Sequence, residues 1–203
     1  MEVLGITGGI GSGKSMVLAL LSKQYGYQVL RTDEIAKELM DSEGPCREAL
    51  LEAFGKGILS EEGGIDRAAY GRLIYGDPEM RRRSDAIVHP AVWKEVEKRL
   101  QGIRAEGRRA AVETALPGEE FRRLCDRIWY VFSPRPVRMN RLMGDRGYSF
   151  EQCLEIMGQQ MAEDGYAAYA DVVTDNGRSF EETEGQIGEL LSEKEVQQRE
   201  ETE

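Results

Sequence analysis

The hydrophobic positions along this chain fall into five short runs, separated by longer stretches with helical spacing. The runs cover residues Val3–Thr7, Gln28–Arg31, Ala110–Glu113, Ile128–Phe132 and Val172–Thr174. The fourth run is apolar throughout and rich in aromatic side chains, as expected of a strand buried on both faces. Strands that alternate with helices are typical of a parallel sheet covered on both sides, so the pattern predicts an α/β fold.

Two segments interrupt the alternation of strands and helices. Residues 33 to about 100 carry several helical patterns and no convincing strand, so we expect a helical lobe inserted after the second strand. Residues 134–168 predict two further helices. The acidic, glutamine-rich segment 192–203 has no apolar period, and we expect a disordered tail there. Residues 1–191 are expected to form one domain, with a core made of residues 1–32, 101–133 and 169–191.

The segment Gly8–Ser15 satisfies the pattern G-x-x-x-x-G-K-[ST] in full, between the first strand and a helical pattern over residues 16–25. Glycines let the backbone wrap closely and turn its N–H groups toward an anion at the start of a helix. In such a loop Lys14 would reach the β- and γ-phosphates, and the Ser15 hydroxyl would bind Mg²⁺. The sequence therefore predicts a nucleoside triphosphate site.

The loop does not by itself identify a reaction. GTPases add an Asn-Lys-x-Asp guanine reader, and neither Asn140 nor Asn176 lies in one. Motor-type ATPases usually add an apolar strand that ends in acidic residues, for which Ala110–Glu113 is a weak candidate. A small kinase acting on a small molecule is the simplest remaining class.

Asp33 lies just beyond the second strand, at the edge where open α/β sheets present their sites. A carboxylate there would orient an alcohol acceptor and take its proton. Thr32 or Asp33 would equally serve as the N-cap of the helix that follows. The spacing alone leaves both interpretations open.

Four arginines, Arg135, Arg138, Arg141 and Arg146, crowd one short segment and are opposed only by Asp145. On a helix, residues 135 and 138 share a face, as do residues 138 and 141. Such a segment suggests a lid that closes over a triphosphate and stabilises the transferring group. An ordinary solvated helix face is the alternative.

The single histidine, His89, follows the apolar pair Ile87-Val88, a position that favours packing or capping over catalysis. We interpret the run Arg81–Arg83 just upstream as solvated charge, with a contact to an anionic ligand as the alternative.

Composition narrows the possible partners. The 203 residues carry 37 acidic and 27 basic side chains, a net charge of −10, which argues against a nucleic-acid surface. Of the bases 20 are arginine, whose planar group matches phosphate oxygens. The longest apolar run has six residues, Met16–Leu21, and no apolar stretch follows Met1, so we expect neither membrane insertion nor secretion. Cys46, Cys125 and Cys153 show no CxxC pairing, as expected of reduced thiols in a cytoplasmic protein.

Several segments together resemble the dephospho-coenzyme A kinase family, in order and spacing from residue 3 to about 191. They are the loop Gly5–Ser15, Thr32–Leu39, the His-Pro element Ile87–Val92, Arg141–Met143, the turn Arg146–Ser149, Gln159 with Gln160, and Ala170–Gly177. The glycine-rich loop alone is shared with many kinases, whereas the combination is specific.

The resemblance implies ATP-dependent phosphorylation of the ribose 3′-hydroxyl of dephospho-CoA, the last step of coenzyme A synthesis. It implies a P-loop NTPase fold with a five-stranded parallel sheet flanked by helices, an inserted helical substrate lobe over about 33–100, and a helical lid over about 134–168. A kinase for a nucleotide or nucleoside, or a non-catalytic nucleotide-binding protein, is the alternative.

The resemblance also assigns roles to residues. Asp33, Lys14 and Arg141 are expected to be catalytic, and Asp33 and His89 to bind the substrate. ATP and Mg²⁺ are the expected cofactors, with Ser15 binding the metal and the molecule acting as a monomer. The expected nucleotide contacts are Gly8, Gly9, Gly11, Ser12, Gly13, Lys14, Ser15 and Met16 of the loop, with Arg138 and Arg146 of the lid.

The sequence departs from the family pattern at several positions. Arg31 stands where the family commonly has a second acidic residue, and Arg138 where the lid commonly has glutamine. The usual Pro-Leu-Leu-x-Glu stretch appears as residues 115–119, Ala-Leu-Pro-Gly-Glu, and the customary Arg-Asp after the lid helix appears as Asp145-Arg146. These differences leave open which lid arginine meets the phosphates.

Overall fold

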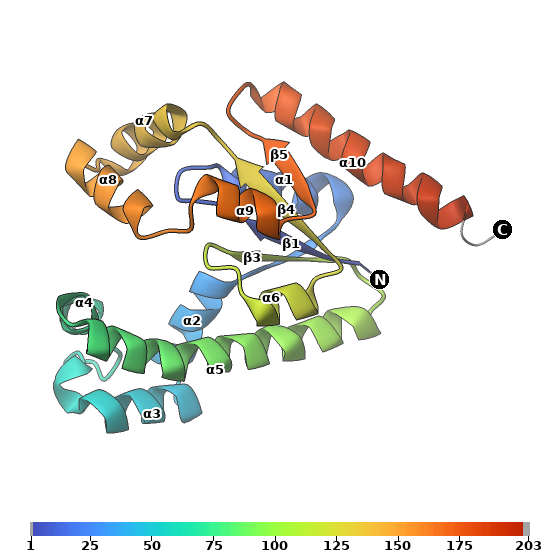
Figure 1. Cartoon of the computed structure of the whole chain (residues 1–203). Coiled ribbons are helices and arrows are strands. Elements are labelled where there is room, and N and C mark those ends of the chain that lie inside the picture. Colours follow the sequence, from blue (N-terminus) through green and yellow to red (C-terminus); the bar gives the residue numbers. More distant parts are fainter. Residues whose placement is uncertain (1, 201–203) are drawn as a thin grey trace. The chain divides into compact units, whose positions relative to one another are not determined.

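A computed structural model describes the backbone of residues 2–200 and the side chains of residues 2–192 (Figure 1). Its sheet has five strands in the order β2-β3-β1-β4-β5. Strand β1 pairs in parallel with β3 and β4, and β4 pairs in parallel with β5. The predicted parallel sheet is therefore confirmed, with strands β1 Val3–Thr7, β2 Gln28–Arg31, β3 Ala110–Thr114, β4 Arg127–Phe132 and β5 Val172–Asp175.

The helices divide between two compact units. One unit comprises Met1–Val29 with Glu106–Glu203, and the other comprises Leu30–Ala105. The first contains α1 Lys14–Tyr25, α6 Glu119–Leu124, α7 Arg135–Arg146, α8 Phe150–Gly158, α9 Glu163–Tyr169 and α10 Phe180–Glu200. The second contains α2 Thr32–Asp41, α3 Pro45–Phe54, the 3₁₀ turn η1 Lys56–Ile58, α4 Arg67–Gly76 and α5 Pro78–Ala105.

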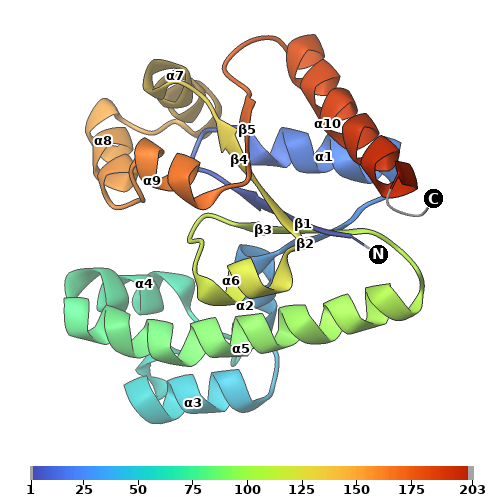
Figure 2. The same ribbon diagram turned by 45° about the vertical axis from the view of Figure 1, so that its right-hand side comes forward.

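In the first unit, alternate residues of β4 serve two different layers. Trp129 and Val131 pack with apolar residues of α1 and α10, which lie together on one side of the sheet (Figure 2). Tyr130 points to the opposite face, where its ring stacks on Tyr166 of α9 with a centroid distance of 5.2 Å. Because both faces are covered, the strand is apolar throughout, as the sequence pattern indicated.

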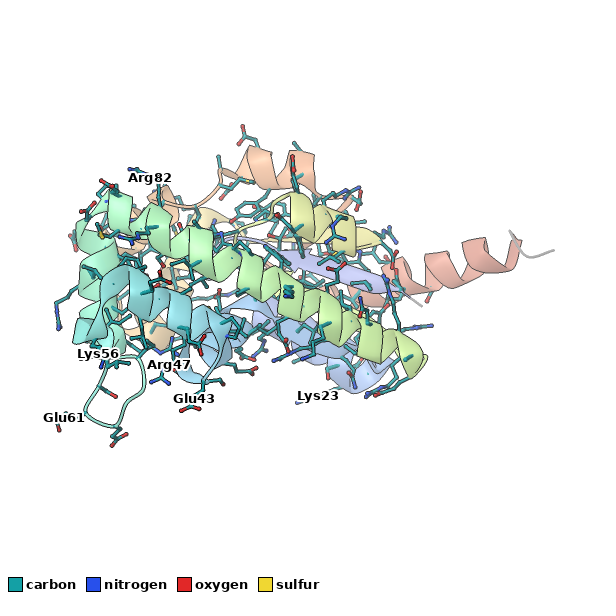
Figure 3. All side chains as sticks on the ribbon, turned by 90° about the horizontal axis from the view of Figure 1, so that it is seen from below. Lys23, Glu43, Arg47, Lys56, Glu61 and Arg82 are labelled. Carbon is teal, nitrogen blue, oxygen red and sulfur yellow. The ribbon has the colours of Figure 1, made fainter. Side chains whose placement is uncertain are left out.

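The second unit is built around α5. Its buried residues Val88, Val92, Val96 and Leu100 recur at every fourth position and form one apolar stripe along the helix. Charged side chains occupy the surface, among them Lys56, Glu61 and Arg82 (Figure 3). The run Arg81–Arg83 is exposed, in agreement with its first interpretation as solvated charge, and Arg83 also lies over the ring of Phe54.

Two expectations about the C-terminal half differ from the structure. Residues 134–168 contain three helices rather than two, because α9 follows α8. Helix α10 continues to Glu200, so the predicted disordered tail is wrong for residues 192–200, while residues 201–203 lie outside the described residues. The segment is rich in Glu, Gln, Lys and Arg, which favour helix without needing an apolar face. Among the described helices, none has the length and apolar character needed to cross a membrane.

Asp171 joins the starts of β4 and β5 to α6. Its carboxylate accepts hydrogen bonds from both terminal nitrogens of Arg122 and from the Ile128 N–H, each at 2.7 Å. The Arg122 hydrogen bonds, followed by the Ile128 N–H, hold the pKa of the Asp171 carboxyl below its usual range. A lowered pKa in the folded state means that the stabilisation is present above the unfolded pKa and is lost as pH falls through the folded one.

Replacing Asp171 by asparagine is therefore expected to reduce the free energy of unfolding at pH 7 by about 1 kcal/mol, because the Arg122–Asp171 pair is partly exposed to solvent. The variant should also lose part of the decline in stability that the parent shows on acidification below about pH 4. Denaturant titrations at several pH values measure both effects. Asp145→Asn is the control, because Asp145 is exposed on α7. Equal pH dependence of the parent and Asp171→Asn would contradict the assignment.

Candidate active site

The glycine-rich loop connects β1 to α1 in the expected way. Gly13 lies at the N-cap of α1 with φ 90°, a conformation that favours glycine, and a Cβ there would collide with the Asn176 side-chain amide. The N–H groups of Gly11, Gly13 and Ser15 donate to no protein acceptor within residues 2–200. Exposed N–H groups at the start of a helix attract anions, so the loop has the geometry of a phosphate site.

Lys14 points back into this loop. Its Nζ donates to the Gly8 carbonyl at 2.7 Å and lies 3.4 Å from Oε1 of Glu113. Glu113 belongs to β3, which pairs in register with β1 so that Ile6 faces Glu113. Both side chains are largely buried, with exposures of 12% and 13%. A lysine and a carboxylate are thus held together at the loop.

Arg141 of α7 contacts the loop from the other side. Its Nη1 lies 3.3 Å from the carbonyls of Gly11 and Ser12 and 3.1 Å from Oγ of Ser133. Its Nη2 donates to the Asn176 carbonyl at 2.8 Å. Within the part of the chain that the structure describes, Arg141 forms no ion pair, so its charge is uncompensated beside a predicted anion site.

Arg138, one turn earlier on α7, is only 6% exposed. Its Nε donates to the Ile10 carbonyl at 2.9 Å, and its Nη1 lies 3.6 Å from Oε1 of Glu163. Arg138 and Arg141 therefore contact the glycine-rich loop from one helix face, as their spacing predicted. Arg146 ends α7 and is exposed, and its side chain forms no hydrogen bond or ion pair with another described residue.

Asp33 lies in the second unit, in the first turn of α2. The N-cap of α2 is Arg31, and no side chain caps this helix, so the interpretation of Thr32 or Asp33 as the cap is wrong. Asp33 is exposed, and its carboxylate has no hydrogen-bond or ion-pair partner among the described side chains. His89 lies on α5, where its Nε2 is 3.6 Å from Oδ1 of Asp85 and half of its side chain is exposed.

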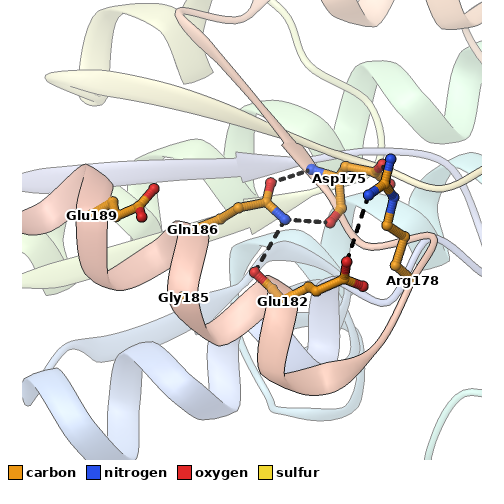
Figure 4. A pocket seen from close by; sticks show the side chains of 6 residues that line it. All are labelled: Asp175, Arg178, Glu182, Gly185, Gln186 and Glu189. Atoms are coloured by element: carbon orange, nitrogen blue, oxygen red, sulfur yellow. Dashed lines mark hydrogen bonds and ion pairs between the residues drawn. The ribbon is translucent and has the colours of Figure 1, made fainter.

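A pocket of about 420 Å³ lies beside the end of β5, and no predicted site residue lines it (Figure 4). Gln186 of α10 binds both the N–H and the carbonyl of Asp175, at 3.0 and 2.9 Å. Arg178 pairs with Asp175 and Glu182, while the lining also includes Glu189, so acidic side chains outnumber basic ones in this pocket. The Gln186 hydrogen bonds hold Asp175 at the end of β5, and the next residue, Asn176, accepts a hydrogen bond from Arg141.

Sequence reasoning underestimated Glu113 and overlooked Ser133. Glu113 was considered only as a weak ending for an apolar strand, yet it lies beside Lys14. The available signal was the position of Glu113 near the end of β3, because β3 is the neighbour of β1, the strand that leads into the glycine-rich loop. Ser133 follows β4, and its hydroxyl oxygen lies 3.0 and 2.8 Å from the carbonyl oxygens of Ser12 and Asn176. Nothing in the local sequence distinguishes it from an ordinary loop serine.

Comparison with known proteins extends over both units. The sequence pattern of the dephospho-CoA kinase family matches residues 2–182. A dephospho-CoA kinase from Carboxydothermus hydrogenoformans is 35% identical over 193 residues, which cover 94% of this chain and 93% of the relative. A relative from Geobacter sulfurreducens with the same name is 36% identical over 194 residues, 94% of this chain and 97% of its own.

Among solved structures, one from Thermus thermophilus has a TM-score of 0.75 at 31% identity and covers 95% of this chain and 97% of its own. A dephospho-CoA kinase from Campylobacter jejuni has a TM-score of 0.70 at 21% identity, covers 94% of this chain and 96% of its own, and shows the shared fold. The P-loop geometry, Arg141 of α7 beside it and a match that spans almost the whole sequence agree. The chain therefore belongs to the dephospho-CoA kinase family.

Proposed function

We propose that this protein transfers the γ-phosphoryl group of ATP to the ribose 3′-hydroxyl of dephospho-CoA, giving CoA and ADP, the final step of coenzyme A biosynthesis. The observation that carries the proposal is the extent of the family match, which runs through Leu30–Ala105 as well as through the P-loop. A P-loop alone is common to many kinases. A match that also covers the helical unit supports dephospho-CoA as the acceptor, and not only ATP as the donor.

On the nucleotide side, the N–H groups of the loop and Lys14 bind the β- and γ-phosphates in this proposal. Arg141 supplies the positive charge that the transferring group needs, because charge neutralisation and positioning are the main parts of phosphoryl-transfer catalysis. Arg146, exposed at the end of α7, is a second arginine that would meet the nucleotide.

The residues present fit Mg²⁺ bound mainly through the nucleotide. Ser15 presents an exposed hydroxyl in the first turn of α1. Mg²⁺ prefers such oxygen ligands and keeps several waters, with phosphates completing its shell. Ser15 would hold the ion, and bound Mg²⁺ would neutralise charge on the phosphates. The described residues contain no group of three or more His, Cys, Asp or Glu side chains arranged for a metal, and this mode of binding needs none.

On the acceptor side, Asp33 orients the 3′-hydroxyl and accepts its proton. The hydroxyl oxygen then forms a bond to the γ-phosphorus, and the bond from that phosphorus to the β–γ bridging oxygen breaks, so that ADP leaves with the electron pair. An exposed carboxylate that neither caps α2 nor pairs with a described cation is available for this task. We further propose that His89 binds the substrate.

We also propose that the protein works as a cytoplasmic monomer. Its three cysteines are unpaired and buried, as expected in a reducing compartment. Burial raises the pKa of the Cys125 thiol to about 12, which makes that thiol unreactive.

The test compares acceptors in an assay of ADP formation with ATP and Mg²⁺. Dephospho-CoA should support turnover, and its product should match authentic CoA in chromatography and mass. The 3′-deoxy analogue of dephospho-CoA, which lacks the acceptor hydroxyl, should support none and still raise the melting temperature by binding. Turnover with AMP or adenosine that equals or exceeds that with dephospho-CoA would overturn the proposal in favour of another small-molecule kinase.

A further inference from the structure

Arg138 is a charged side chain that is more than nine-tenths buried, next to Gly9 and Ile10 of the P-loop. Burying a charge costs stability unless the group is paired and hydrogen-bonded. Arg138 meets this requirement with protein groups: Nε donates to the Ile10 carbonyl, Nη2 lies 3.4 Å from Oε1 of Gln160, and Nη1 faces Glu163. Its donors and its charge are therefore engaged within the protein.

Arg138 and Gln160 together bind both backbone polar groups of Ile10 in the loop. The Ile10 N–H donates to Oε1 of Gln160 at 2.8 Å, and the Ile10 carbonyl accepts from Arg138. Gln160 in turn contacts Arg138, and Glu163, at the start of α9, completes the set. Residues from α7, from the α8–α9 connection and from α9 thus converge on Ile10.

The guanidinium also lies directly against Gly9, where a Cβ would collide with it. The backbone of the loop therefore packs closely against the guanidinium of Arg138 at this point. Arg141 differs in two ways: it contacts Gly11 and Ser12, nearer to the helix start, and no described carboxylate compensates its charge.

We propose that Arg138 is a positioning residue that holds Gly9 and Ile10 of the P-loop in their phosphate-binding conformation, with Glu163 fixing its guanidinium. This assignment rests on the proposed function of the loop, and it replaces the expectation that Arg138 itself binds the triphosphate. In this chain Arg141 is the arginine that contacts phosphate, whereas Arg138 supports the loop through the Ile10 carbonyl.

The first test measures hydrogen exchange in peptides that cover residues 8–15, without nucleotide or acceptor. Glu163→Gln, which removes the ion pair with Arg138, and Arg138→Met, which removes the hydrogen bond to Ile10, should each accelerate exchange in the loop roughly tenfold, because either loss lowers the cost of local opening. Glu155→Gln, an exposed lid residue, is the matched control and should leave exchange unchanged. Parental exchange in both Glu163→Gln and Arg138→Met would overturn the proposal, whatever the protein phosphorylates.

The second test uses the sign of a change in ATP affinity. If Arg138 were a phosphate ligand, Glu163→Gln would release its guanidinium and remove a negative charge, so ATP would bind equally well or more tightly. If Arg138 positions the loop, the same variant should bind both ATP and ADP several-fold more weakly, because the loop loses its support. Calorimetric titration with ATP and ADP distinguishes these results, and an increase or no change in affinity would overturn the proposal.

Discussion

A variant with methionine in place of Lys14 is expected to lose roughly 100- to 1000-fold in kcat/KM for ATP, the usual effect of removing one charge-stabilising donor. Methionine has a similar length and no charge, so it should occupy the same space with little change to the loop. The Lys14 ammonium lies 2.7 Å from the Gly8 carbonyl, within the loop that would enclose the phosphates. Affinity should therefore fall more for ATP than for AMP, which lacks the β- and γ-phosphates.

Glu113 allows a sharper version of this experiment. Once Lys14 is replaced, the Glu113 carboxylate loses a cation that lies 3.4 Å away and faces the incoming triphosphate with its negative charge. The double variant Lys14→Met/Glu113→Gln should therefore bind ATP more tightly than Lys14→Met. Lys23→Met, an exposed change in the last turn of α1, is the control and should behave as the parent. Equal losses for ATP and AMP would contradict the role assigned to Lys14.

The second large effect concerns the acceptor. Asp33→Asn is expected to lower kcat by roughly 100- to 10,000-fold, the range for a residue that moves a proton in the transition state. Asparagine keeps the shape of the side chain but cannot take the proton of the 3′-hydroxyl. ATP affinity should change by less than about twofold, because the phosphate-binding residues are untouched.

Glu34→Gln provides a matched control for Asp33→Asn, since it makes the same chemical change one residue later. The Glu34 carboxylate pairs with Arg31 at 2.9 Å on the exposed surface, and such pairs contribute little. Single-turnover kinetics with dephospho-CoA, together with ATP titration, would measure both variants. Parental turnover in Asp33→Asn would contradict its role as proton acceptor and would favour the non-catalytic alternative.

The features that the sequence predicted well are encoded locally. Gly8–Ser15 needs only its own glycines and the strand and helix on either side, so pattern and structure coincide there. The strand Ile128–Phe132 was evident because both of its faces are buried. The pairing of Arg138 and Arg141 on one face followed from helical spacing alone.

The features that were missed depend on contacts between distant segments. Glu113 acquires its meaning from the register that places β3 next to β1, which a single strand does not reveal. An arginine on a lid helix has the same pattern whether it meets phosphate or a buried carbonyl, so the role of Arg138 required its partners Ile10 and Glu163. Helix α9 has only seven residues and contains Gly165, yet the Tyr166 hydroxyl anchors it to the Ala115 carbonyl at 2.8 Å.

The position of β1 in the middle of the sheet has a consequence for the order of folding. Val3 is synthesised before its neighbours in the sheet, which are Ala110 of β3 and, beside Leu4, Arg127 of β4. At about 5–20 residues per second, the ribosome supplies these neighbours roughly 5–25 s later. Until then both edges of β1 lack their partners, whereas Leu30–Ala105 can already form the contacts between its own helices. The central strand is thus made well before its partners and completed late, so we expect the newly made chain to be most prone to aggregation before β4 emerges.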